Sequence, residues 1–554
     1  MISRPALGML LTLFCVAPAI AVAEHHGPAS NFNPGIRPDT AEAATEERVA
    51  EDAWFDHLQV LAADDLKGRK TGTQEFLRAA DYVEGQFKKI GLKPAGFDGY
   101  RQQVGFHTLQ LDTEKSSLRL DDAGGKTTEL KIGTEAVLSA NKPGTIAIEA
   151  PLVFAGHGLV VPGVGVNDLE GLDLKGKIAV IFAGAPATVH GPLKAYYRTA
   201  AIRWKALKAA GAVGIVTIAE PRLNQNSRSD AGQRSRPVDQ LSDPALNPLD
   251  GAQVVVTVPA ANAAVWFSSS PHNYEELALL AKEGKPLPRF AISTKLRATT
   301  VTQETVKYEA PNLVGLLPGS DRRLNREYVV LTAHLDHLGV GKPKNGDDIY
   351  NGAMDNAVGI ASLIETAKAL ATGERPKRSI LFIAFTGEEE GELGSQFYAR
   401  YPTLQRSHIV AELNMDMYLP LFPLRLLEVQ GLGESTLGND VRAAAQLNDI
   451  EVQFDKQPDE NRFIRSDQTS FVKYGIPALA FKFGWLAGSP EQKTFNDWIH
   501  DCYHHASDDL KQTIDREAAV HFDRVLLTLT RRVADSPTAP EWYPESFFST
   551  IPRT

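Results

Sequence analysis

Apolar residues follow two periodicities in the second half of the chain. From residue 312 onward, near-continuous apolar runs alternate with segments whose apolar positions recur every three or four residues. The runs cover residues 328–333, 380–385, 409–415, 426–429 and 478–483, and the helical patterns cover 357–371 and 395–401. Runs of that length are typical of central strands covered by helices on both faces. We therefore predict an α/β fold with a mixed, largely parallel central sheet flanked by helices.

The first half of the chain has shorter and more mixed patterns. Apolar residues recur at helical spacing between Phe76 and Ile90, and Gly91 follows where a helix C-cap is expected. Alternating runs between residues 108 and 138 predict short strands. Residues 132–288 combine apolar strand runs with a helix around 202–210, a pattern of strands and helix that differs from the segments on either side.

Two polar segments carry no such pattern. Residues 222–250 are rich in Asn, Ser, Arg and Pro, which predicts a mobile loop. From Ser536 to the end, four prolines predict an extended tail.

Composition places the chain among soluble globular proteins of more than one domain. It has 554 residues, 43% of them hydrophobic and 23% charged. A formal net charge of -10 and the lack of a basic stripe argue against a nucleic-acid partner.

The N-terminus has the pattern of a secretory signal. Arg4 precedes an apolar run over residues 6–22, and Ala21-Val22-Ala23 offers a cleavage site after Ala23. A membrane anchor is the alternative, but the run is short and contains a proline. We expect export to the periplasm or secretion without a stable membrane anchor. Cleavage would leave Cys502 as the only cysteine, so no internal disulfide is expected.

Polar residues follow three of the predicted strands at the point where each strand ends. His334 and Asp336 follow the first strand, Glu388 and Glu389 the second, and Asp416 the third. Asp355 stands at the start of a predicted helix, and all these residues are well separated along the sequence. Carboxyl ends of parallel strands meet at one edge of a sheet, where ligands bind. Imidazole and carboxylates suit zinc or a similar cation, and a spare carboxylate beside the metal can act as a general base.

These motifs resemble those of the M28 zinc peptidases in order and spacing. The signatures are His334-Leu335-Asp336, Gly352-Ala353-Met354-Asp355-Asn356, Gly387-Glu388-Glu389, Asn414-Met415-Asp416, Ser466-Asp467 and Tyr503-His504 with Asp508. Residues 173–179 and 205–214 resemble a protease-associated domain, a common insert in this family. The implied fold is that of the zinc aminopeptidases, also called phosphorylase/hydrolase-like.

The resemblance implies a role for each matching residue and two Zn²⁺ per chain. His334 and Asp416 would hold one zinc, Glu389 and His504 the other, and Asp355 would bridge them. Glu388 would be the general base. Asp336 would accept a hydrogen bond from the far imidazole nitrogen of His334. Residues implied for substrate binding are Ser466, Asp467 and Tyr503.

The resulting domain organisation has five parts. They are a signal peptide (1–23), an N-terminal part of the peptidase domain (46–131), a protease-associated insert (132–288), the catalytic part of the peptidase domain (289–535) and a C-terminal tail (536–554).

Several positions leave alternatives open. His337 could replace His334 as a ligand, and His505 could replace His504. Asp336 could be a turn residue, Asp467 a helix cap, and Glu390 a solvated charge. The sequence departs from the family pattern at Met354, Glu392 and Gln468, none of which is an implied ligand.

The function implied is hydrolysis of peptide substrates, with release of N-terminal residues by an aminopeptidase. A carboxypeptidase would need arginines for a terminal carboxylate, and Arg462 and Arg465 are the candidates. Glutaminyl cyclisation on a similar fold uses one zinc, whereas two are implied here. A non-catalytic binding protein should lack a ligand or the base. Oligomeric state does not follow from the sequence.

Overall fold

The computed structural model describes residues 41–186, 188–189, 191–219, 237–268, 270–344, 346–457, 460 and 462–553. The chain divides into two units, residues 1–48 and residues 49–554. The predicted signal peptide lies outside the described residues. In the part of the chain that is described, no helix combines the length and apolarity needed to cross a membrane.

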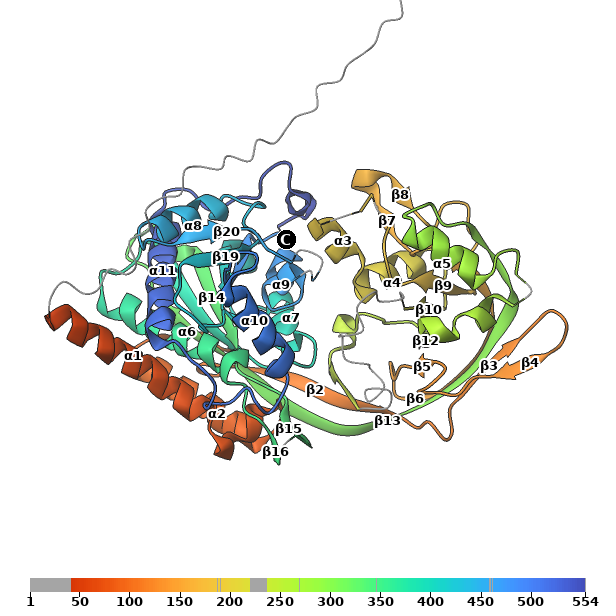
Figure 1. Cartoon of the computed structure of the whole chain (residues 1–554), viewed down its shortest axis with the longest axis horizontal. Coiled ribbons are helices and arrows are strands. Elements are labelled where there is room, and N and C mark those ends of the chain that lie inside the picture. The colour runs from red at the N-terminus through yellow and green to blue at the C-terminus, as the bar shows by residue number, and fades with distance from the viewer. Residues whose placement is uncertain are drawn as a thin grey trace, which may run out of the picture. The chain divides into compact units, whose positions relative to one another are not determined.

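The centre of the second unit is a mixed sheet with a parallel core (Figure 1). Its four parallel strands lie in the order β17 (Ser379–Phe385), β14 (Tyr328–His334), β18 (Ile409–Asn414) and β21 (Ala478–Phe483). Antiparallel strands flank this core, namely β13 (Arg289–Leu317) beside β17 and β19 (Leu426–Gln430) beside β21. The predicted mixed, largely parallel α/β sheet is confirmed.

Both faces of the central strands are buried, which explains their continuous apolar sequences. In β14, Val329 and Leu331 belong to one hydrophobic core and Val330 to another. In β17 the same alternation puts Ile380 and Phe382 on one face and Leu381 on the other. Successive side chains of a strand point to opposite faces, so a strand between two helical layers must be apolar at every position.

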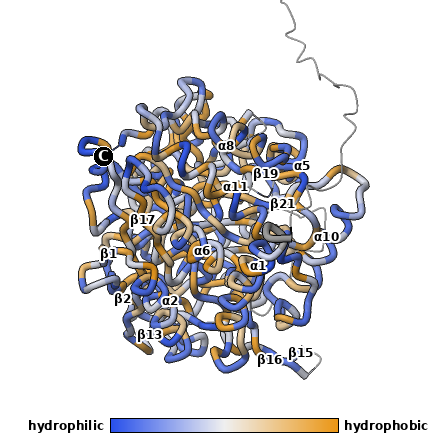
Figure 2. The backbone as a smooth tube through the Cα atoms, turned by 90° about the vertical axis from the view of Figure 1, so that its left-hand side faces the viewer, coloured by the Kyte–Doolittle hydropathy of each residue, from blue (hydrophilic) through white to orange (hydrophobic). Residues whose placement is uncertain are grey.

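Helices supply the two covering layers. One layer contains the C-terminal part of α1 (Ala41–Leu61), α2 (Gln74–Ile90), α6 (Val358–Thr372), α8 (Leu437–Gln446) and α11 (Arg516–Asp535). The other contains α7 (Leu393–Arg400) and α9 (Gln468–Val472). The apolar stretch of α6 lies near the centre of the view in Figure 2. The helices predicted around residues 76–90, 357–371 and 395–401 are present as α2, α6 and α7.

The ends of α2 are fixed by local chemistry. The side chain of Thr73 accepts a hydrogen bond from the backbone N–H of Phe76, 3.1 Å away, and so caps the helix N-terminus. Gly91 follows the last turn with a φ of 85°, the left-handed conformation that glycine adopts without a steric penalty. The predicted C-cap at Gly91 is confirmed.

The segment from 132 to 288 shares one hydrophobic core with residues 109–130 and 292–298 and forms a second core from its own residues. Strands β9 (Ile178–Phe182), β10 (Gly214–Ile218) and β12 (Val254–Val258) are parallel, and β6 (Gly144–Ala155) runs alongside β9. Helix α4 (Ala200–Ala209) packs on this sheet through Trp204 and Leu207. The 29-residue strand β13 joins the two parts, because it pairs with β6 near its start and with β2 (Arg101–Leu111) and β17 near its end.

Two expectations about polar segments need correction. Residues 220–236 lie outside the described residues, but Val238–Leu241, inside the expected loop, form strand β11 and pair with β2. Four residues without apolar alternation become a strand because β2 offers an unpaired edge. The C-terminal tail is not a free extended segment: Phe548 is fully buried and its ring packs 5.5 Å from that of Phe463.

Candidate metal centre

Three parallel strands deliver the implied ligands to one edge of the sheet. His334 is the last residue of β14, Asp416 follows the end of β18 by two residues, and Glu389 follows β17 by four. Asp355 lies in the irregular turn that precedes α6. His504 comes from the turn after α10 (Pro490–Asp501). The structure therefore brings all five implied ligands together.

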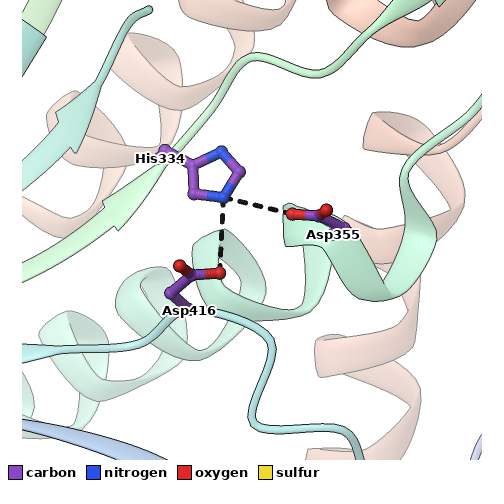
Figure 3. A group of neighbouring side chains, drawn as sticks. All are labelled: His334, Asp355 and Asp416. Carbon is purple, nitrogen blue, oxygen red and sulfur yellow. Dashed lines mark ion pairs between the residues drawn. The ribbon is translucent and has the colours of Figure 1, made fainter. Parts of the chain in front are cut away.

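Asp355 lies at the centre of this cluster. Its carboxylate oxygens lie 3.2 Å from His334 Nε2 and 3.3 Å from His504 Nε2. His334 Nε2 is also 3.5 Å from an oxygen of Asp416, as Figure 3 shows. On the other side, His504 Nε2 is 3.2 Å from Glu389. A carboxylate with one oxygen toward each group is suited to bridge two cations.

His337 joins the cluster at a position the sequence did not suggest. The sequence allows His337 as a metal ligand in place of His334. In the structure, however, its Nδ1 lies 2.6 Å from Glu389 and 3.9 Å from Asp355, on the side of His504. His334 and His337 therefore serve different halves of the cluster. Two triads have ligand atoms close enough to share a cation: His334, Asp355 and Asp416, and His337, Asp355 and Glu389.

Several side-chain atoms of the cluster lack a hydrogen-bond partner, as expected for the ligands of a metal ion. Nε2 of His334, Nε2 of His337 and one oxygen of Asp416 are buried without a hydrogen-bond partner. Buried polar atoms of this kind cost free energy unless a partner is supplied. A borderline cation such as Zn²⁺ takes imidazole nitrogen and carboxylate oxygen as ligands. The residues present therefore fit zinc.

Electrostatics indicate the same requirement for positive charge. Burial and the neighbouring Asp355 raise the pKa of Glu389, but contacts with His337 and His504 outweigh them and lower it to about 2. Burial lowers the pKa of His504, yet Asp355 and Glu389 raise it to about 10. The Glu389 carboxylate is thus stabilised in its ionised form by the two histidines beside it.

Glu388 and Glu389 face the cluster through a turn that Asp336 holds. The two oxygens of the Asp336 carboxylate accept hydrogen bonds from the backbone N–H groups of Glu388 (3.1 Å) and Glu389 (3.2 Å). The expected bond from His334 goes elsewhere: His334 Nδ1 lies 3.1 Å from the backbone carbonyl oxygen of Asp336. Asp336 thus orients His334 through its main chain and the glutamates through its side chain.

A cavity of about 190 Å³ opens onto the cluster. Its lining consists of Asp355, Glu388, Glu389, Gly391, Glu392, Asp416, Met417, Arg465, Tyr503 and His504. Burial raises the pKa of Glu388 well above its ordinary value, although His334 opposes this. A carboxyl group with a raised pKa exchanges protons more readily near neutral pH. Tyr503 stacks on His504 with ring centres 3.9 Å apart.

The residues implied for substrate binding do not share one environment. Tyr503 lines the cavity, whereas Ser466 and Asp467 are buried and do not belong to its lining. Ser466 accepts a hydrogen bond from the Asn414 side chain at 2.9 Å. Burial raises the pKa of Asp467 to about 8 against the opposing charge of His334.

Two buried cations that support the cluster were missed in the sequence. Arg69 donates hydrogen bonds to the backbone carbonyls of Leu335 (2.9 Å), Asn351 and Gly352 (3.1 Å), so it fixes both ligand-bearing loops. Lys482 donates to the carbonyl of Met417 at 3.0 Å and so fixes the loop of Asp416. Neither residue is next to a ligand in sequence. Arg69 stands in a polar, basic stretch, and Lys482 is a single charge in an apolar run, so neither position has a pattern that predicts its role.

The sequence of the chain is similar to those of known peptidases. The sequence model of peptidase family M28 matches residues 312–530. Aminopeptidase Y of Saccharomyces cerevisiae is 31% identical over 193 residues, which is 33% of this chain and 32% of that protein. Leucine aminopeptidase 2 of Trichophyton equinum is 27% identical over 254 residues, 44% of this chain and 48% of that protein. The chain thus spans less than half of the length of these relatives.

Among solved structures, an aminopeptidase from Aneurinibacillus sp. strain AM-1 is similar over 91% of this chain and 97% of its own, with 19% identity and a TM-score of 0.49. The matched residues 312–530 contain every implied metal ligand as well as Glu388. Through this region, the chain is similar to peptidase family M28.

Proposed function

We propose that the chain is an exported aminopeptidase that uses two zinc ions and Glu388 to release N-terminal residues from peptides. The observation that carries this proposal is the central position of Asp355 between His334 and Asp416 on one side and Glu389 and His504 on the other. The relatives named aminopeptidases support the polarity of cleavage.

His334 and Asp416 would hold one zinc, Glu389 and His504 the other, and Asp355 both. His337, with its Nδ1 2.6 Å from Glu389, would orient that ligand. Bound zinc would polarise the scissile carbonyl and lower the pKa of a water molecule. The remaining chemistry belongs to side chains of the protein.

Glu388 is placed to move the proton. It lines the cavity beside both ligand groups and is itself in neither triad. Its carboxylate would accept a proton from water as the oxygen attacks the carbonyl carbon. When the C–N bond breaks, Glu388 would give that proton to the leaving amine. The two hydrogen bonds from the turn to Asp336 hold Glu388 in position for both steps.

A panel of blocked peptides tests the polarity. We expect the full-length zinc enzyme to hydrolyse a free peptide and its C-terminal amide at similar rates and to leave an N-acetylated peptide intact. Cleavage of the N-acetylated but not the amidated peptide would indicate a carboxypeptidase. Formation of pyroglutamate from an N-terminal glutamine, without hydrolysis, would indicate a cyclase.

We further propose that residues 132–288 form a protease-associated domain that limits substrate size. Helix α3 (Gly191–Tyr197) brings Tyr196 and Tyr197 against the ring of Phe547, at 5.1 and 5.4 Å between ring centres. The next residue, Phe548, packs on Phe463, two residues before the cavity residue Arg465. This row of rings links the insert to the cavity rim. Replacing both tyrosines by alanine should raise kcat/KM for long peptides relative to dipeptides.

Export is proposed from the sequence of residues 1–23. The test is N-terminal sequencing of the protein recovered from the periplasm or medium of an expressing bacterium, which should begin at Glu24.

A further inference from the structure

The cavity contains one acidic residue that the proposed metal chemistry does not use. Four lining residues are implied ligands and Glu388 is the implied base, which leaves Gly391, Glu392, Met417, Arg465 and Tyr503 to contact a substrate. Glu392 is the acid among these. A substrate whose carbonyl lies at the metals must therefore place neighbouring groups near this carboxylate.

The backbone N–H and carbonyl groups of Glu392 form hydrogen bonds, but its carboxylate does not. Its N–H donates to the carbonyl of Glu388 at 2.8 Å, and its own carbonyl accepts from the N–H of Gln396 at 3.0 Å. The side chain does not cap α7, which begins at the next residue. Within the described ranges, the carboxylate forms no ion pair or hydrogen bond that would neutralise it.

Glu392 also adopts an unusual backbone conformation, with a φ of 61°. This left-handed conformation is strained for residues other than glycine, and residues strained in this way concentrate at functional sites. The conformation starts the turn into α7 while the side chain stays at the cavity.

Arg465, the cavity residue of opposite charge, pairs with another acid. Its guanidinium lies 3.7 Å from Glu460, and 58% of its side chain is exposed. Arg465 and Lys473 act on the carboxylate of Glu392 only through their charge, and neither forms an ion pair with it in the described part of the chain. A carboxylate in a partly enclosed cavity is stabilised by an incoming cation, since burial without a partner is unfavourable.

We propose that Glu392 binds a cationic group on the residue to be released, and so makes the enzyme selective for that charge. The cation has two possible sources: the free α-ammonium group, present in every aminopeptidase substrate, and the side chain of an N-terminal lysine or arginine. This inference rests on the proposed aminopeptidase function, and it names the substrate chemistry of the same cavity.

The test compares the zinc-loaded full-length enzyme with E392Q, which keeps the size of the side chain and removes its charge. The substrates are lysyl and norleucyl anilides, which differ by the terminal ammonium group. If the side chain is the cation, kcat/KM of E392Q falls about tenfold or more for lysyl and little for norleucyl anilide. If the α-ammonium is the cation, both fall by a similar factor through KM.

A matched control is E390Q, which removes an acid two residues away. Glu390 lies outside the cavity lining and pairs with Lys70, so both kcat/KM values should stay within about twofold of wild type. Competitive inhibition by n-butylamine gives a second readout, which should weaken in E392Q and not in E390Q. Zinc content measured on each variant separates loss of binding from loss of metal.

The reversed charge keeps the proposal testable if E392Q is inactive. E392K should shift the ratio of glutamyl to lysyl anilide hydrolysis upward, or, in an inactive protein, abolish n-butylamine binding measured by calorimetry. Unchanged anilide kinetics and unchanged n-butylamine inhibition in E392Q would overturn the role of Glu392. A wild-type enzyme that hydrolyses no anilide with zinc present would instead refute the proposed function.

Discussion

The two halves of the metal cluster are built from different parts of the fold. His334 and Asp416 lie at or next to the ends of neighbouring central strands, and only 1% of the His334 side chain is exposed. His504, in contrast, follows a helix in a turn with a φ of 56°, and 27% of its side chain is exposed. Strand ends in a buried sheet are rigid, whereas a turn at the surface opens more easily. We therefore expect the two zinc sites to differ in affinity, with the His334 site the tighter one.

The largest loss of activity is expected on replacing Glu388, which belongs to neither half of the cluster. E388Q should lower kcat by about 10²- to 10⁴-fold, because the amide cannot accept the proton of the attacking water. Zinc content should remain that of the wild type, since Glu388 belongs to neither triad. Steady-state kinetics and metal analysis on the same preparation check both parts. Wild-type kcat in this variant would place the base elsewhere.

Arg69 is expected to have the next largest effect, because it holds the loop after His334 and the loop before Asp355. R69M should destabilise the protein by about 3 to 5 kcal/mol, since several buried carbonyl groups lose their donor at once. Urea denaturation measures the change in the free energy of unfolding. R78M is a suitable control, as Arg78 makes an exposed hydrogen bond, to the carbonyl of Asp65. Equal stability of the two variants would show that the hydrogen bonds of Arg69 contribute little.

The comparison itself is tested by removing one histidine from each half. H504A should lose one zinc to a chelator at a concentration about 10- to 100-fold lower than wild type and keep the other. H334A should lose the tighter zinc. H505A is the matched control, because the Nδ1 atom of His505 lies 2.9 Å from the carbonyl oxygen of Asp501, outside the cluster. If H504A and H334A release zinc in the same way, the two sites do not differ as proposed.

The smallest expected effect is a change in stability at Glu412, a buried residue of β18, the strand that leads to Asp416. Burial raises the pKa of Glu412 well above its ordinary value, despite a hydrogen bond from Thr332. The Thr332 hydroxyl lies 2.5 Å from Glu412 and 2.8 Å from the side-chain oxygen of Asn414, and it has one proton to donate. A protonated Glu412 allows both contacts of Thr332 to be hydrogen bonds, because Glu412 donates to Thr332 and Thr332 donates to Asn414.

The stability that protonated Glu412 contributes is therefore fully present below the pKa of the unfolded chain, about 4.5. It is lost as the pH rises toward the higher pKa of the folded state. E412Q donates at every pH, so its stability relative to wild type should increase above pH 5, by at most about 1.4 kcal/mol per pH unit. Urea denaturation of the metal-free proteins between pH 4 and pH 8 measures this difference. A difference that does not change with pH would mean that Glu412 is ionised in the folded protein.

Sequence patterns predicted the strand-built half better than the turn-built half. The apolar runs before His334 and Asp416 predicted the two strands of that half, and parallel strands bring their ends together by geometry alone; in the other half, only Glu389 follows such a run. His504 follows no strand, and its place in the cluster was implied only by the resemblance to the family. The position of His337 depends on how the loop after β14 curls, which no periodicity encodes.

Long-range contacts account for the other differences. Residues 238–241 form a strand because the edge of β2, more than a hundred residues away, is available. The C-terminal tail is held because Phe548 enters a pocket beside Phe463. Arg69 and Lys482 are buried because backbone carbonyls of distant loops surround them. Local sequence describes none of these partners, so their pairing could be found only in the folded chain.

The most direct test of the proposed two-zinc aminopeptidase mechanism is a titration of the chelator-stripped, full-length protein with zinc. Hydrolysis of a free leucyl peptide should rise as zinc is added and reach its maximum at two equivalents per chain, with the N-acetylated peptide untouched throughout. Full activity at one equivalent, or activity in the stripped enzyme, would contradict the bridging role of Asp355 and the mechanism built on it.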